Sequence, residues 1–196
     1  FDAEIFPKFD SIVKLGKRKF ADPAKSRNTA QSAEELLSDA LHFKPMFKKF
    51  LNDIVTMTGA NCYGFAGKDD EFLIKSSESM NAKLPGWGAD KVRDVLRTSI
   101  ICEDIQTLES SIKNSVQLCE SNGLDYNLFN FYNNRVAYGD EDRRTGHYTG
   151  YFSCHLTVVL TENREGGSPA IILAEVQFHM SSILNCDENC IKMHIH

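Results

Sequence analysis

The stretch AIILAEVQF, residues 170–178, is the part of the sequence that decides the fold. A continuous apolar run of this length is typical of a central strand that is buried on both faces of a sheet. One carboxylate, Glu175, interrupts the run, and a carboxylate is costly to bury unless it has a partner. We therefore expect a sheet whose middle strand carries an ion-paired or functional carboxylate.

Strand and helix patterns alternate on either side of this stretch. Further strands are expected at CYGFAG (62–67), EFLIK (71–75), VLRTSIIC (95–102), YNLFNFY (126–132) and GYFSCHLTVVL (150–160). Because helical patterns lie between them, we predict an α/β (α+β) fold, in which helices flank one mixed β-sheet. We expect a helical N-terminal segment over residues 1–58 that packs on a core over residues 59–196, in one compact domain overall.

The helices are expected from their end signals. Ser32 followed by Glu35 is a capping box, and Pro45 is expected to begin a second helix that Gly59 ends. Ser76 or Ser77 caps a short helix in KSSESMNAKL (75–84), after which PGWG (85–88) is expected to be a loop. A longer helix is expected over 105–121, with Asp104 as its cap, and a further helix at the C-terminal tail.

Composition and charge exclude several classes of protein. The chain has 196 residues, with 22 Lys and Arg against 27 Asp and Glu, which gives a net charge of −5. This balance argues against a nucleic-acid binder that works by bulk charge, although a local basic cleft remains compatible with it. No stretch approaches the length of a membrane span. We expect a cytoplasmic protein if it is a stand-alone enzyme, or else a secreted effector or toxin fragment, with no membrane partner.

The six cysteines are too few for a disulfide scaffold. Three of them, Cys62, Cys102 and Cys154, lie in apolar strand patterns and are expected to be buried free thiols. Cys186, Cys190 and His194 follow one another at helical spacing and share one face of the expected tail helix. A metal site, a disulfide and a half-buried helix face all remain open for these three residues.

Three polar clusters interrupt the apolar pattern. Asp94 and Glu175 belong to different strands and can share a Mg²⁺ ion that holds nucleotide phosphates, or Asp94 can form a salt bridge to Arg97 or Lys91. The second cluster, RRTGHYTGYFSCH (143–155), is either a phosphate- and base-binding hairpin or an ordinary polar hairpin. The third, LIKSSESMNAKL (73–84), offers lysines and helix N-terminal amides to an anion, or a solvated surface.

Together and in this order, the motifs resemble those of the synthetase domain of the RelA/SpoT family, the alarmone synthetases. The resemblance covers about residues 45–185 and rests on LIKSSESMNAKL, DVLRTSII, HYTGYFSCH and EVQFHM. Its most specific parts are G-Y-x-S-x-H, from Gly150 to His155, and E-V-Q-F-H, from Glu175 to His179. The resemblance implies a nucleotidyltransferase-like fold of the small, stand-alone or toxin-like branch.

The resemblance also implies an activity, the Mg²⁺-dependent transfer of pyrophosphate from ATP to a 3′-hydroxyl. The acceptor would be GDP or GTP, an adenosine nucleotide, or the 3′ end of tRNA, which the net charge does not favour. Asp94 and Glu175 would be the catalytic and metal-binding carboxylates. The side chains expected around the ATP phosphates are Lys75, Lys83, Ser79, Arg97, Arg143, Arg144 and His147. Those expected to contact the acceptor are Tyr151, Ser153, His155 and Gln177.

The sequence also departs from the family pattern. Leu73 and Ser99 stand where the family has arginines, His147 replaces a lysine, and Met180 replaces a threonine. Each missing arginine removes charge-assisted hydrogen bonds worth about 1.5–3 kcal/mol. A catalytically silent nucleotide-binding or protein-interaction module on the same fold is therefore the alternative function.

Overall fold

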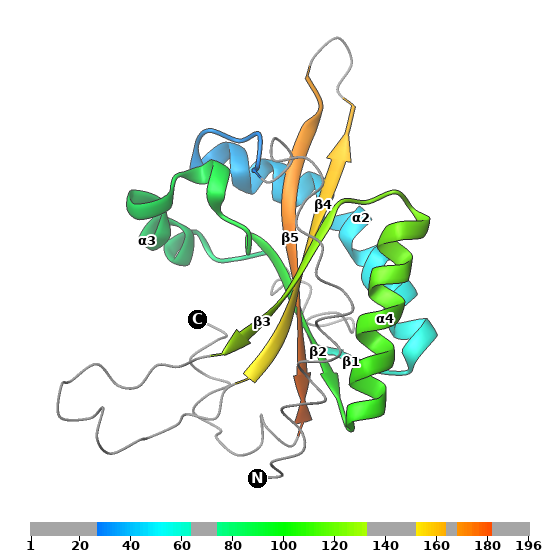
Figure 1. The fold of residues 1–196 in the computed structure, drawn as a ribbon. Coiled ribbons are helices and arrows are strands. Elements are labelled where there is room, and N and C mark those ends of the chain that lie inside the picture. Colours follow the sequence, from blue (N-terminus) through cyan, green and yellow to red (C-terminus); the bar gives the residue numbers. More distant parts are fainter. Residues whose placement is uncertain (1–26, 64–73, 133–151, 164–167, 182–196) are drawn as a thin grey trace, which may run out of the picture.

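A computed structural model describes residues 27–63, 74–132, 152–163 and 168–181, and it contains one five-stranded sheet (Figure 1). The strands are β1 (Asn61–Tyr63), β2 (Leu96–Cys102), β3 (Tyr126–Tyr132), β4 (Phe152–Glu162) and β5 (Ala170–Met180). Their order in the sheet is β1-β2-β5-β4-β3. β2 runs parallel to β5 and the other pairs are antiparallel, so the predicted mixed sheet is confirmed.

β5 occupies the middle of the sheet, as its apolar run predicts. It pairs with β2 on one side and with β4 on the other. Before β2 begins, the segment around Asn28 takes the place beside β5: Thr29 N donates to the carbonyl of Ile171, and Leu173 N donates to Asn28 Oδ1. The first residues that the structure describes are therefore tied to the central strand.

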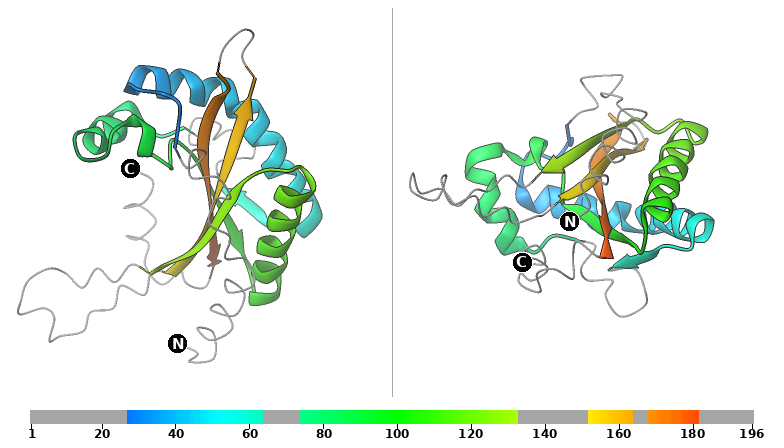
Figure 2. Two further views of the ribbon diagram at one scale, coloured as in Figure 1. Left: turned by 45° about the horizontal axis from the view of Figure 1, so that its top comes forward. Right: turned by 60° about the horizontal axis from the view of Figure 1, so that its bottom comes forward.

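Two helices cover one face of the sheet. These are α2 (Ala33–Thr58) and α4 (Ile105–Ser121), which contact each other and both contact β5 (Figures 1 and 2). Helix α3 (Ser77–Trp87) lies at the opposite side of the sheet from α4 and is followed by the 3₁₀ helix η3 (Ala89–Lys91). None of the helices in the described ranges has the length and apolarity that crossing a bilayer requires.

The expected helix caps are present. Ser32 Oγ accepts from Glu35 N, Ser76 Oγ accepts from Ser79 N, and Asp104 accepts from Thr107 N. Gly59 ends α2 with φ of 66°, in the left-handed region that glycine adopts without steric cost.

Two expectations about proline are wrong. Pro45 lies inside the single helix α2 rather than at the start of a second one, and Pro85 to Trp87 belong to α3 rather than to a loop. A proline removes the hydrogen bond to the carbonyl four residues earlier, here that of Leu41 or Asn81. Both of these residues are exposed, so water can replace the missing donor. The packing of the buried face then keeps each helix continuous.

The core lies between the two helices and one face of the sheet. It contains the alternating apolar residues of β4 and β5 together with the buried side of α2, whose largest members are Phe43, Phe47 and Phe178. Cys102, Cys119 and Cys154 are buried free thiols, which confirms the expectation for Cys102 and Cys154. The tail residues Cys186, Cys190 and His194 lie outside the described residues. The division of the chain at residue 58 stays a prediction.

Candidate functional site

The face of the sheet that turns away from α2 and α4 carries polar side chains. Successive residues of a strand point to opposite faces, and paired residues of neighbouring strands share a face. Leu156 and Val176 belong to the core, so His155, Thr157, Glu175 and Gln177 lie on the other face. The register of β2, β5 and β4 places these residues in two rows, Arg97–Glu175–Thr157 and Ser99–Gln177–His155.

A buried ion pair lies where β2 begins. Lys75 Nζ donates to Asp94 Oδ2 at 2.7 Å, and the two side chains are 5% and 14% exposed. Lys75 directly follows Ile74, which forms an isolated antiparallel bridge with Leu96, and its backbone N donates to the carbonyl of Val95. Arg97 or Lys91 was expected as the alternative partner of Asp94, but the cation in this ion pair is Lys75. Lys75 reaches the carboxylate because this bridge sets its backbone beside the start of β2.

Glu175 lies in a hydrogen-bonded row of side chains. Gln177 Nε2 donates to Glu175 Oε1 at 2.7 Å, and His155 Nδ1 lies 3.4 Å from Glu175 Oε2. On the far side of the imidazole, Ser153 Oγ is 2.7 Å from His155 Nε2. When Nδ1 carries the hydrogen and donates to Glu175, Nε2 can accept from the Ser153 hydroxyl, which satisfies both ring nitrogens.

These contacts keep Glu175 ionised despite its burial. Burial acts to raise its pKa, but the hydrogen bond of His155, the charge of this ring when it is protonated, and the hydrogen bond of Gln177 together outweigh it, so the pKa lies below the ordinary value. The charge of Asp94 acts in the opposite direction and raises the pKa of Glu175. The two carboxylates are therefore close enough to interact electrostatically.

Two neighbouring carboxylates fit a Mg²⁺ ion. Mg²⁺ in proteins is usually held by one or two carboxylates, while water and substrate phosphates complete its octahedron. Asp94 and Glu175 supply hard oxygen donors from the start of β2 and the middle of β5. Within the described ranges, no group of three or more His, Cys, Asp or Glu side chains is arranged to hold a metal. Among the described residues, Asp94 and Glu175 are thus the pair that could hold such an ion.

The structure brings together six of the predicted site residues on the polar face or at its edge, namely Lys75, Asp94, Ser153, His155, Glu175 and Gln177. Arg97 lies beside Glu175 in the register, and it has no ion pair within the described part of the chain. Ser79 and Lys83 belong to α3, which begins two residues after Lys75. Arg143, Arg144, His147 and Tyr151 lie outside the described residues.

Thr157 and His179, which are not among the site residues expected from the sequence, also lie on the polar face. Both are buried, and Thr157 is the direct partner of Glu175 in the β4–β5 register. Among the described residues, Thr157 Oγ1 has no hydrogen-bond partner. The signal was available in the sequence, because residues two apart in a strand share a face and Thr157 follows His155 by two positions.

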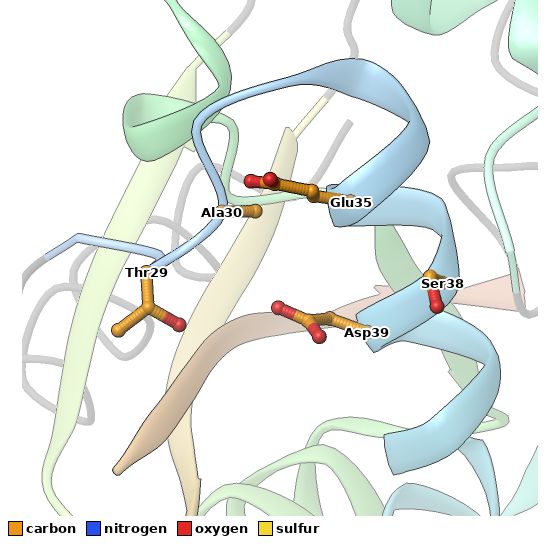
Figure 3. Close-up of a pocket in the computed structure, with 5 residues that line it drawn as sticks. All are labelled: Thr29, Ala30, Glu35, Ser38 and Asp39. Atoms are coloured by element: carbon orange, nitrogen blue, oxygen red, sulfur yellow. The ribbon is translucent and has the colours of Figure 1, made fainter. Parts of the chain in front are cut away.

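A pocket elsewhere in the molecule does not involve these residues. It is lined by Thr29, Ala30, Glu35, Ser38 and Asp39, at the start of α2 (Figure 3). Glu35 Oε2 accepts from Gln31 N, so this carboxylate already serves the helix cap. None of the residues predicted to take part in function lines this pocket, and the candidate site remains the polar face of the sheet.

Comparison with solved structures finds similarity to bacterial proteins. A protein from Streptococcus mutans UA159 superposes with a TM-score of 0.53 at 16% identity, covering 83% of this chain and 80% of that one. A GTP pyrophosphokinase family protein from Streptococcus pneumoniae gives a TM-score of 0.50 at 17% identity, covering 76% and 70%. Small alarmone synthetase 2 from Bacillus subtilis gives 0.48 at 19%, covering 82% and 78%.

No protein-family model matches the sequence, and no curated protein matches it significantly. At 16% and 17% identity the first two solved structures establish a shared fold. The fold that the sequence motifs led us to expect is therefore confirmed.

Proposed function

We propose that this chain transfers the β,γ-pyrophosphoryl group of ATP to the 3′-hydroxyl of a nucleotide. The observation that carries the proposal is the joint placement of Asp94, Glu175 and Lys75 at one polar edge and face of the sheet. The shared fold with a GTP pyrophosphokinase family protein supports it. Transfer of this kind depends on positioning and charge neutralisation more than on covalent chemistry, and these residues offer both.

The bond changes of the proposed reaction are simple. The acceptor 3′-oxygen forms a bond to the β-phosphorus of ATP, and the bond from that phosphorus to the α,β-bridging oxygen breaks, which releases AMP. The hydroxyl proton passes to a carboxylate. Glu175 is ionised at neutral pH, so it can accept a hydrogen bond from the hydroxyl and orient it.

The low pKa of Glu175 is compatible with this role. A carboxylate with a lowered pKa is a weak base, but phosphoryl-type transfer passes through a loose transition state in which little nucleophile deprotonation is needed beforehand. The proton can therefore move as the new bond forms. Bound Mg²⁺ would supply neutralisation of the phosphate charge. Lys75 can supply a further positive charge, and Arg97 stands beside Glu175 with its guanidinium available for a phosphate.

We also propose which residues contact the acceptor and which class of acceptor is used. Ser153, His155 and Gln177 lie on the same face of the sheet as Glu175, where they can contact the acceptor or orient Glu175 toward it. We propose a nucleotide acceptor, either a guanosine or an adenosine nucleotide, ahead of tRNA because the net charge is −5.

The experiment that tests the proposal uses ATP labelled at the γ-phosphate, Mg²⁺ and the full chain. GDP, GTP, ADP, AMP and total tRNA are offered in parallel, and products are separated by thin-layer chromatography. We expect label on one acceptor, lost by at least about 100-fold in Glu175→Gln and Asp94→Asn. Asp90→Asn is the matched control, because Asp90 is a nearby carboxylate that pairs with Arg27 and should leave transfer unchanged.

Two results would contradict the proposal. Absence of label on every acceptor, with ATP still binding by calorimetry, would identify a silent nucleotide-binding module. Absence of both transfer and binding would show that the fold has been kept without the function.

A further inference from the structure

The ion pair between Lys75 and Asp94 presents a conflict with the proposed metal site. Asp94 is one of the two carboxylates that would hold a divalent cation, yet its Oδ2 atom already accepts from the Lys75 ammonium at 2.7 Å. Both side chains are largely buried, so water screens their attraction weakly. A divalent cation that approaches this carboxylate therefore meets a positive charge already in contact with it.

The backbone of Lys75 is held while its side chain is long enough to move. The residue lies between the Ile74–Leu96 bridge and the N-cap Ser76 of α3, and its N–H donates to the carbonyl of Val95 at 2.9 Å. A lysine ammonium is a compact charge with three donors on a flexible four-carbon stem. The ammonium can thus exchange an oxygen of Asp94 for another anionic oxygen without movement of the main chain.

A triphosphate is the anion that would favour this exchange. It brings several negative charges to the site, and the N-terminus of α3, directly after Lys75, carries partial positive charge that favours phosphate at the same place. When the ammonium turns to a phosphate, its positive charge no longer competes with a cation for the carboxylate of Asp94. Without the triphosphate, the ammonium satisfies Asp94 and the cation has no such opening.

We propose that Lys75 acts as a built-in counter-ion of Asp94, which makes tight binding of a divalent cation depend on a nucleoside triphosphate at the same site. This inference rests on the proposed function for the identity of the ligands. It adds the order and coupling of their binding: the cation alone binds weakly, and the triphosphate relieves the competition. By linkage, the cation strengthens triphosphate binding by the same factor.

The test measures the binding of Mn²⁺ to the chain in the absence of nucleotide, from the electron paramagnetic resonance signal of the ion that stays free. Mn²⁺ is an appropriate probe because it takes the same oxygen ligands as Mg²⁺. We expect weak binding to the unaltered chain and about tenfold or greater tightening in Lys75→Met, because that change removes the competing charge. Lys75→Arg, which keeps a positive charge, should bind Mn²⁺ as weakly as the unaltered chain.

Two further variants locate the effect. Lys91→Met removes an exposed lysine three residues from Asp94, so equal tightening there would mean a general charge effect and would overturn the proposal. The double variant Lys75→Met/Asp94→Asn should lose the gain, because the gained site is Asp94 itself. If Lys75→Met does not fold, as judged by circular dichroism, Lys75→Gln serves as a second neutral variant.

The outcomes separate this inference from the proposed function. Tightened Mn²⁺ binding in Lys75→Met together with a negative transfer assay would support the counter-ion role of Lys75 and contradict the proposed enzymatic activity. Active transfer together with unchanged Mn²⁺ binding in both neutral variants would support the proposed enzymatic activity and contradict the counter-ion role of Lys75.

Discussion

The two faces of the same sheet solve the problem of burial in opposite ways. On the face that α2 and α4 cover, the strands contribute apolar side chains such as Leu156, Val176 and Phe178, which need only close packing. On the other face, Ser153, His155 and Glu175 are also buried, and each has hydrogen-bonding partners. The helix-covered face stabilises the fold through the apolar surface that it buries, and the other face holds ionised and polar groups in a fixed geometry.

The titratable groups show the same contrast. Burial on the helix-covered side raises the pKa of Cys102 to about 11, with the hydrogen bond of Ser111 acting against it. On the polar face, hydrogen bonds and charge keep the pKa of Glu175 low although this residue is also buried. Burial by itself therefore does not decide ionisation, because the partners on each face do.

The largest expected effect comes from two neighbouring residues of β5 that point to opposite faces. Phe178→Ala should reduce the free energy of unfolding by about 3–5 kcal/mol, since a large, fully buried side chain leaves a cavity. Gln177→Ala, its matched control, should cost about 1.5–3 kcal/mol, the loss of one hydrogen bond to a charged group. Urea denaturation measures both, and equal losses would mean that the two faces do not differ in this way.

An intermediate effect is expected in the pH dependence of stability. The pKa of Glu175 in the folded chain lies below its ordinary value of 4.5, so its contribution to stability is present above that pH and is lost as the pH falls. Glu175→Gln should therefore show a shallower decline of unfolding free energy below about pH 4.5. Denaturation series between neutral and acidic pH measure the slopes, and identical slopes for both proteins would contradict the lowered pKa.

The smallest effect is expected at Thr157, whose buried hydroxyl has no hydrogen-bond partner among the described residues. Thr157→Val keeps the shape and removes the hydroxyl, so it should leave stability unchanged or raise it by about 1 kcal/mol. Thr157→Ser keeps the hydroxyl and removes a methyl group, so it should lower stability by about 1 kcal/mol. Thermal unfolding distinguishes the two signs, and a clear loss in the valine variant would reveal a partner for this hydroxyl.

Local sequence patterns predicted much of the fold. The positions of β2, β3, β4 and β5, and the caps Ser32, Ser76 and Asp104, follow from residue types that act over a few positions. Alternation within β4 also places Ser153 and His155 on one face of that strand, whereas the apolar run of β5 does not indicate which face carries Glu175. The same local signals gave wrong predictions at Pro45 and Pro85, which lie inside helices, because packing of the buried helix face outweighed the effect of the proline.

The sequence by itself determined which residue types are available for chemistry, and which of them lie two positions apart in a strand and so share a side. Only the tertiary structure decided that β2 runs parallel beside β5, which sets Arg97 next to Glu175, and that Lys75 pairs with Asp94. The reason is physical. Arg97 and Lys91 are nearer to Asp94 in sequence and carry the same charge, so no local pattern separates the three candidates. The backbone bridge between Ile74 and Leu96 brings Lys75 within reach and thereby selects it.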